Sequence, residues 1–192
     1  MGAHPKGGTK SIMSDTDTKC LETFPEWLKS LSSDAQDLSK AVGNQDAPDA
    51  VRRYAAAGLN YLFKSLDLIP DGIEDLGYLD DAFVLRVAAS LAVSEDAAAK
   101  EKAPEVARLA GDTALIEALL GEDYARLRTY VEGLKGAAAR GRTVDDILDD
   151  EKVRLDFQNE VSGWATSYEP PTFAKDEKNL VKLKSFLSAK LP

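Results

Sequence analysis

Residues 61–81, which read YLFKSLDLIPDGIEDLGYLDD, decide how this chain folds. Pro70 keeps Ile69 out of the helical region of the backbone, so a helix ending near residue 63 cannot continue into one beginning near residue 77. The apolar residues between these ends are too numerous for a solvated loop: Leu66, Leu68, Ile69, Ile73 and Leu76. The stretch therefore predicts two helices joined by a packed loop, whose buried backbone groups need hydrogen-bond partners.

Asp and Asn side chains supply such partners, because they accept hydrogen bonds from backbone N–H groups at turns and helix starts. Four carboxylates flank the loop: Asp67, Asp71, Asp80 and Asp81. We expect them to cap helices and to pair with nearby cations, for which the candidates are Arg52, Arg53, Lys64 and Arg86. We expect Asn60 to bond the loop backbone. The residues predicted to clasp the loop are Asn60, Asp67, Pro70, Asp71, Gly77, Tyr78, Asp80 and Asp81.

The same four carboxylates also have the chemistry of a divalent-cation site. Hard cations such as Mg²⁺ and Ca²⁺ prefer oxygen ligands, and the two carboxylate pairs would converge across the hairpin: Asp67 with Asp71, and Asp80 with Asp81. No EF-hand spacing is present, and Pro70 argues against a regular helix around the first pair. A structural clasp needs no cofactor, whereas the alternative takes Mg²⁺ or Ca²⁺. The sequence leaves both interpretations open.

Two motifs in this stretch, Asp67-Leu68-Ile69-Pro70-Asp71 and Gly77-Tyr78-Leu79-Asp80-Asp81, resemble the signature of the YkvA-like domain family, a bacterial family of unknown function. The resemblance covers roughly residues 51–90. It implies two helices joined by an Asp/Pro loop, and it brings neither a reaction nor a ligand. This chain has Lys64-Ser65 where the family often has Ser-Pro, and Glu74-Asp75 where a further Pro is frequent, so its loop is more acidic.

Apolar residues recur at helical spacing over almost every segment after residue 20. The expected helices are 22–42, 46–63, 77–94, 104–110, 112–120, 123–139, 144–168 and 175–190. No useful alternation predicts a strand, and no Gly/Ser-rich linker separates two apolar halves. The sequence therefore predicts an all-α protein, a compact multi-helix bundle in a single domain over residues 21–192, built around the hairpin at 51–90.

The only His and the only Cys of the chain are His4 and Cys20. Because residues 1–20 hold few sizeable apolar side chains, we expect a disordered tail there, with residues 1–12 an upstream extension if Met13 is the natural start. This placement argues against Ser/His/Asp or Cys/His catalysis and against zinc or redox motifs. The sequence has no signal-peptide apolar region and no apolar run of the roughly 20 residues that span a bilayer. A cytoplasmic protein is expected.

Charge is distributed unevenly along this acidic chain. Its 24 basic and 33 acidic residues give a net charge of -9, which opposes nucleic-acid binding. Residues 171–192 nevertheless carry five lysines against two acids, and residues 175–190 form a basic amphipathic helix. We expect this helix to pack on the acidic body near residues 145–151. The alternative is docking to an anionic membrane surface or a partner groove through Lys178, Lys182, Phe186 and Leu187.

These observations favour a non-catalytic helical protein that acts through an unidentified protein partner, as an interaction, scaffold or regulatory module. No residue is predicted to be catalytic, because the folded body lacks His and Cys and the motif aspartates have a structural explanation. The competing class is a divalent-cation-binding protein or a metal-dependent enzyme that uses Asp67, Asp71, Asp80 and Asp81.

Overall fold

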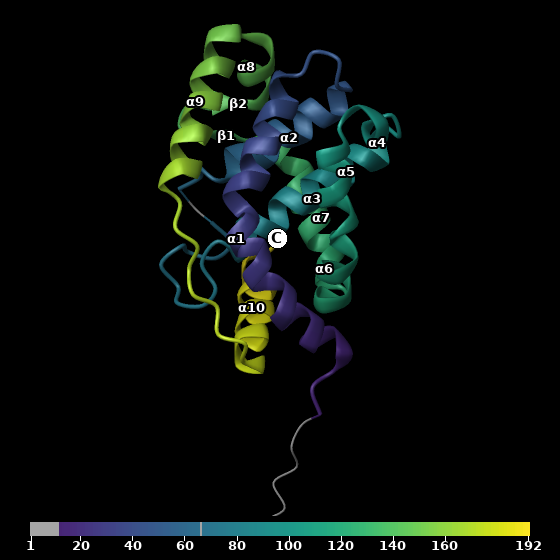
Figure 1. Cartoon of the computed structure of the whole chain (residues 1–192), viewed down its shortest axis with the longest axis vertical. Helices are drawn as coiled ribbons and strands as arrows, with labels where there is room; N and C mark the ends of the chain where they lie inside the picture. The colour runs from purple at the N-terminus through teal and green to yellow at the C-terminus, as the bar shows by residue number, and fades with distance from the viewer. Residues whose placement is uncertain (1–11, 66) are drawn as a thin grey trace, which may run out of the picture.

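The computed structural model describes residues 12–65 and 67–192, and its architecture is an all-α bundle, as predicted (Figure 1). The main helices are α1 (Asp15–Gly43), α2 (Asp49–Tyr61), α3 (Leu79–Glu95), α7 (Asp123–Gly133), α9 (Glu151–Ser167) and α10 (Glu177–Lys190). Shorter elements are α4 (Ala99–Lys102), α5 (Pro104–Gly111), α6 (Thr113–Leu120), the 3-10 helix η1 (Leu134–Gly136) and α8 (Val144–Asp149). Strands β1 (Ala138–Ala139) and β2 (Arg142–Thr143) form a two-residue antiparallel pair, which the sequence did not predict.

Helix α3 forms the centre of the bundle and contacts α1, α2, α5, α6 and α7. It is apolar around nearly its whole circumference, which is the pattern of a helix buried on all sides. Helix α2 approaches it closely at Gly58, where an added Cβ would lie 3.2 Å from the Cβ of Ala88. The hairpin of α2 and α3 is therefore the core around which the other helices are arranged.

The prediction of a disordered amino-terminal tail is wrong for residues 15–20, because these residues form the first turns of α1, which begins at Asp15. Ser14 caps this helix by accepting a hydrogen bond from the Asp17 backbone N–H at 3.1 Å. Cys20 is completely buried and begins the apolar stripe that continues through Phe24 and Trp27. A reduced Cys packs as a small apolar side chain, so it belongs to the core and not to a tail. His4 lies outside the described residues.

The single helix predicted over residues 144–168 is two helices. Helix α8 ends at Asp149, and Asp150 caps α9 by accepting from the backbone N–H groups of Lys152 at 2.8 Å and Val153 at 3.1 Å. A capping box marks the start of α8. Thr143 accepts from the Asp146 backbone at 3.1 Å, and Asp146 accepts from the Thr143 backbone at 2.9 Å.

Helix α10 packs on the body of the protein, but not where the sequence predicted. Its stripe of Leu180, Leu183 and Leu187 is buried. The helix contacts α1 and lies at the end of the molecule opposite α8, so it is remote from the acidic residues 145–151 (Figure 1). Arg126 of α7 also holds its carboxyl end by donating to the backbone carbonyl of Ser188 at 3.2 Å. Burial of apolar surface, rather than attraction between unlike charges, determines where this helix packs.

No helix formed by the described residues is long and apolar enough to cross a membrane.

Candidate functional site

The loop between α2 and α3 is packed against the helices, as predicted. Leu68, Ile69 and Leu76 are buried. The loop closes on itself at Gly77, where an added Cβ would lie 2.1 Å from the backbone carbonyl oxygen of Asp71. Only glycine fits this close approach, because a backbone atom cannot move aside as a flexible side chain can.

Asp80 joins the loop to both helices of the hairpin. One oxygen of its carboxylate, Oδ2, accepts from the Tyr61 hydroxyl at 2.5 Å and from the Ile69 backbone N–H at 3.1 Å. The same Tyr61 hydroxyl accepts from the Leu68 backbone N–H at 2.7 Å. We call Tyr61, Asp80 and the backbone of Leu68 and Ile69 the clasp. It satisfies two loop N–H groups that are buried and would otherwise lack partners.

Tyr61 is the member of the clasp that sequence reasoning missed. It lies in the last turn of α2 and resembles an ordinary apolar position of that helix. Its hydroxyl can both donate and accept, which the clasp requires. The available signal was a buried tyrosine directly before a packed loop, because a buried hydroxyl needs a partner.

Asn60 does not take part in the clasp, contrary to the prediction. Its Nδ2 donates to the backbone carbonyl of Arg142 at 3.2 Å and thus joins α2 to the short β-hairpin. It lies one residue before Tyr61 on α2, and consecutive residues of a helix point in different directions.

Asp80 and Asp81 are buried without a cationic partner among the described residues. Their exposed fractions are 0% and 3%, and neither Oδ1 of Asp80 nor Oδ2 of Asp81 has a hydrogen-bond partner in the part of the chain that the structure describes. Burial raises the pKa of Asp80 to about 7, against the lowering effect of its bonds from Tyr61 and Ile69. Burial and then the charge of Asp80 raise the pKa of Asp81 well above its usual range.

Asp67 and Asp71 lie nearer the surface of the same cluster. Asp67 is half-buried, and burial together with the charge of Asp71 raises its pKa to about 6, although the charge of Lys64 acts in the opposite direction. Burial also raises the pKa of Asp71, while a hydrogen bond from Tyr78 lowers it. The four carboxylates therefore influence one another electrostatically.

The predicted cations do not form ion pairs with these carboxylates. Arg53 pairs with Asp49 at 2.7 Å and with Asp145 at 2.6 Å. Lys64 donates to the Tyr130 hydroxyl at 3.1 Å, and Arg52 donates to a backbone carbonyl of α1. Arg86 follows Asp80 and Asp81 by six and five residues, which places it on another face of a helix with 3.6 residues per turn.

Arg86 instead forms a buried network with three other elements. Its guanidinium donates to Asp34 of α1 at 3.2 Å and to Asp112, directly before α6, at 3.0 Å. The guanidinium carbon lies 4.2 Å from the ring centroid of Trp27. Asp34 also accepts from Arg108 of α5 at 2.8 Å. This network joins α1, α3, α5 and α6.

The same four carboxylates were the candidate ligands for Mg²⁺ or Ca²⁺: Asp67, Asp71, Asp80 and Asp81. Across residues 12–65 and 67–192, no three or more His, Cys, Asp or Glu side chains are grouped so that they would hold a metal ion. The loop carboxylates interact through their charges without forming such a ligand set.

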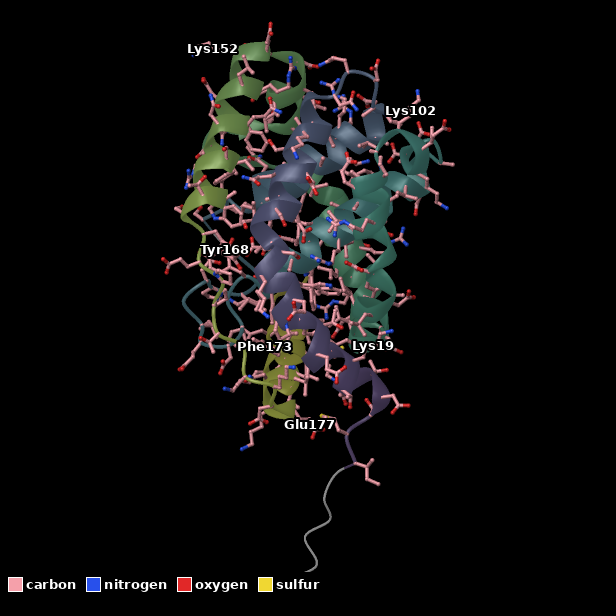
Figure 2. The ribbon with its side chains drawn as sticks, in the orientation of Figure 1. Lys19, Lys102, Lys152, Tyr168, Phe173 and Glu177 are labelled. Carbon is pink, nitrogen blue, oxygen red and sulfur yellow. The ribbon has the colours of Figure 1, made fainter. Side chains whose placement is uncertain are left out.

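The loop also contacts the segment that leads into α10. Asp75 accepts from the Ala174 backbone N–H at 3.1 Å. The rings of Tyr78 and Tyr168 are 5.2 Å apart, and Trp164 lies 5.0 Å from Tyr168. Figure 2 shows Tyr168 where the chain leaves α9, on the side of the molecule that carries the loop. The chain between α9 and α10 is thereby held along the loop.

The exposed face of α10 is the second candidate site. Val181 is 58% exposed, and Lys178 and Lys182 are exposed beside it. A surface depression of about 450 Å³ is lined by Asp176, Glu177, Lys178, Val181 and Lys182. Two other residues were predicted to take part in docking. The prediction is wrong for Leu187, which is buried in the core, and Phe186 is half-buried against the core. We call Lys178, Val181 and Lys182 the basic face.

The protein is therefore a helical bundle in which buried side chains hold the loop between α2 and α3. The model of a family described as a protein of unknown function, DUF1232, matches residues 51–86. This interval holds most of α2, the loop and the first half of α3, and therefore the whole clasp. The chain thus contains a domain of unknown function where the motif resemblance predicted one. No curated protein and no solved structure matches the chain.

Proposed function

We propose that this chain is a non-catalytic, cytoplasmic helical interaction protein whose basic face binds an acidic protein surface. The matched domain serves as a YkvA-like hairpin that stabilises the bundle, and α10 presents the binding surface. The observation that carries this proposal is the division of α10 into two faces. One face is a buried leucine stripe, and the other exposes Val181 between Lys178 and Lys182.

An acidic protein fits this surface better than an anionic membrane does. A helix that lies in a membrane interface inserts its apolar face, and in α10 that face is already buried in the bundle. A single exposed valine offers little apolar area for insertion into lipid. Two lysines around a small apolar contact suit a protein surface, where charge complementarity speeds association and apolar contact slows dissociation.

Site-specific photo-crosslinking in the native cell tests the proposal. A photoreactive amino acid at Val181 should form a covalent adduct with one protein, and the same group at exposed Thr129 of α7 should not. Adding K178E/K182E should abolish the adduct, whereas K100E/K102E should preserve it. The control pair is exposed on α4 and makes the same change in net charge. Binding of the identified protein should then be reproduced with purified components.

Two results would contradict this function. One is an adduct that forms equally well in the K178E/K182E background, since the lysines would then play no part. The other is co-sedimentation of the purified chain with phosphatidylserine vesicles that is lost in K178E/K182E and retained in K100E/K102E. That result would identify an anionic membrane as the binding partner.

A further inference from the structure

The two ends of the molecule carry charge of opposite sign. Residues 144–156, which form α8 and the start of α9, contain six acidic and two basic residues, a net charge of -4. Residues 175–190, which include α10, contain five lysines and two acidic residues, a net charge of +3. Figure 2 labels Lys152 at one end of the long axis and Glu177 at the other.

Each charged end also exposes an apolar side chain. Among the described residues, the large apolar side chains with high exposure are Ile12, Leu155 and Val181. Leu155 is 51% exposed on α9. Exposed Glu151, Lys152 and Asp156 lie near it, and Lys152 pairs with Asp156 at 3.4 Å, which leaves Glu151 as the unpaired charge beside Leu155 among the described residues. Val181 holds the corresponding place on the basic face. Both surfaces therefore combine an apolar centre with charged neighbours, and their charges are complementary.

A single molecule cannot bring these two surfaces together. Helix α10 is fixed by its buried leucines and by Arg126, and it lies at the end opposite α8 (Figure 1). The attraction that the sequence predicted between residues 175–190 and residues 145–151 is therefore not satisfied within one chain. It is available between two copies.

We propose that a second copy of this chain is an occupant of the basic face, so that α10 of one copy docks on the start of α9 of the next. This inference rests on the proposed function, because it names the acidic surface that α10 binds. The contact joins two different surfaces, so it is heterologous and either extends from copy to copy or closes into a ring. Because exposed charges dominate it, the contact weakens as salt screens them.

Sedimentation velocity of the full chain, with buffer in place of any ligand, tests the contact. The weight-average mass should rise with protein concentration at low salt, and roughly 0.5 M NaCl should return it to that of the monomer. K178E/K182E should remain monomeric at low salt, and the matched control K100E/K102E should associate like the wild type.

A charge exchange separates this contact from any general effect of charge or folding. D149K/E151K reverses two exposed acids that form no ion pair among the described residues, and it should also remain monomeric. An equimolar mixture of K178E/K182E and D149K/E151K should associate again, because the unaltered basic α10 of the second can dock on the unaltered acidic start of α9 of the first. The two reversed surfaces are also of opposite charge. Recovery of mass in the mixture requires that these two surfaces meet.

Three results would overturn the head-to-tail contact. They are a monomer at every concentration at low salt, association that K178E/K182E leaves unchanged, and a mixture of the two variants that stays monomeric while each is folded. If the chain is monomeric and the Val181 crosslink to another protein still depends on Lys178 and Lys182, the proposed function stands and only this inference fails.

Discussion

Helix α3 contributes to two sets of buried ionisable side chains. The free-energy cost of burying a charge is offset in a different way in each set. In the Asp34–Arg86–Asp112 network, Arg86 and Asp34 are buried together, and two acids face one guanidinium. Asp80 of the clasp and the adjacent Asp81 are as deeply buried, but no ion pair among the described residues reaches either one.

The difference follows from the chemistry of the two side chains. An arginine stays protonated in proteins, so a buried guanidinium needs anions around it. A buried carboxyl has a second option, because it can take up a proton and become neutral. The first turn of α3 favours anions through the helix dipole by about 0.3–1 kcal/mol, yet the pKa values of Asp80 and Asp81 are raised. Desolvation therefore outweighs the dipole here.

The largest effect is expected from breaking the arginine network. Arg86→Met removes the buried cation between Asp34 and Asp112 and should lower the free energy of unfolding by about 3–5 kcal/mol. Urea denaturation measures this loss. Adding Asp34→Asn should restore part of it, because in Arg86→Met the buried Asp34 carboxylate keeps only the exposed Arg108 as a cationic partner. A loss below about 1 kcal/mol for Arg86→Met would show that the network contributes little.

The clasp should respond less strongly to the loss of its hydroxyl. Tyr61→Phe removes the donor to Asp80 and the acceptor for the Leu68 N–H, and should cost about 1–3 kcal/mol by urea denaturation. Tyr130→Phe is the matched control, since its half-buried hydroxyl accepts only from Lys64 among the described residues. Equal losses in the two variants would contradict the special role of Tyr61.

The pH dependence of stability distinguishes proton uptake from pairing with a cation. The pKa of Asp80 rises from 3.8 to about 7 on folding, so between these values the folded chain holds a proton that the unfolded chain lacks. The contribution of Asp80 and Asp81 to the free energy of unfolding should therefore fall as the pH rises from about 4 to about 7.

Asp81→Asn removes one of the two buried charges and should make this decline shallower. At pH 8 the free energy of unfolding of the variant should exceed that of the wild type by about 1 kcal/mol, which is roughly the free energy that corresponds to a pKa change of one. Urea denaturation at pH 5 and pH 8 in EDTA measures the difference. If Mg²⁺ or Ca²⁺ raises the melting temperature of the wild type at pH 8 but not that of Asp81→Asn, a cation compensates the pair.

The smallest effect is expected from an exposed ion pair, which sets the scale for the buried ones. Arg53→Met breaks contacts to Asp49 and Asp145, both of which are largely exposed. The cost should be about 0.2–1 kcal/mol and should shrink in high salt. A loss as large as that of Arg86→Met would mean that burial is not what separates these two arginines.

Much of the fold was predictable because it depends on neighbours in the sequence. Pro70 separates two helices, Leu68, Ile69 and Leu76 pack the loop, and Thr143 with Asp146 forms a capping box. Each follows from local backbone geometry or from apolar spacing, which a single sequence displays.

The charged partners were not predictable in the same way. Arg86 pairs with Asp34, which is 52 residues away in the chain, and not with the carboxylates close to it. Tyr61 is recognised as a clasp residue only once Asp80 and the loop backbone are placed around its hydroxyl. Cys20 is core because the stripe of α1 faces the bundle from its first turns.

By itself, the sequence determined that the chain is helical, where the central hairpin is interrupted and which stripe of α10 is apolar. These properties depend on steric limits and hydrogen bonds that act over a few residues. Only the tertiary structure decided which cation meets which carboxylate and at which end of the molecule α10 lies. Apolar burial is not directional, so it brings distant segments together according to shape and area, and the charged side chains pair with whatever lies within reach.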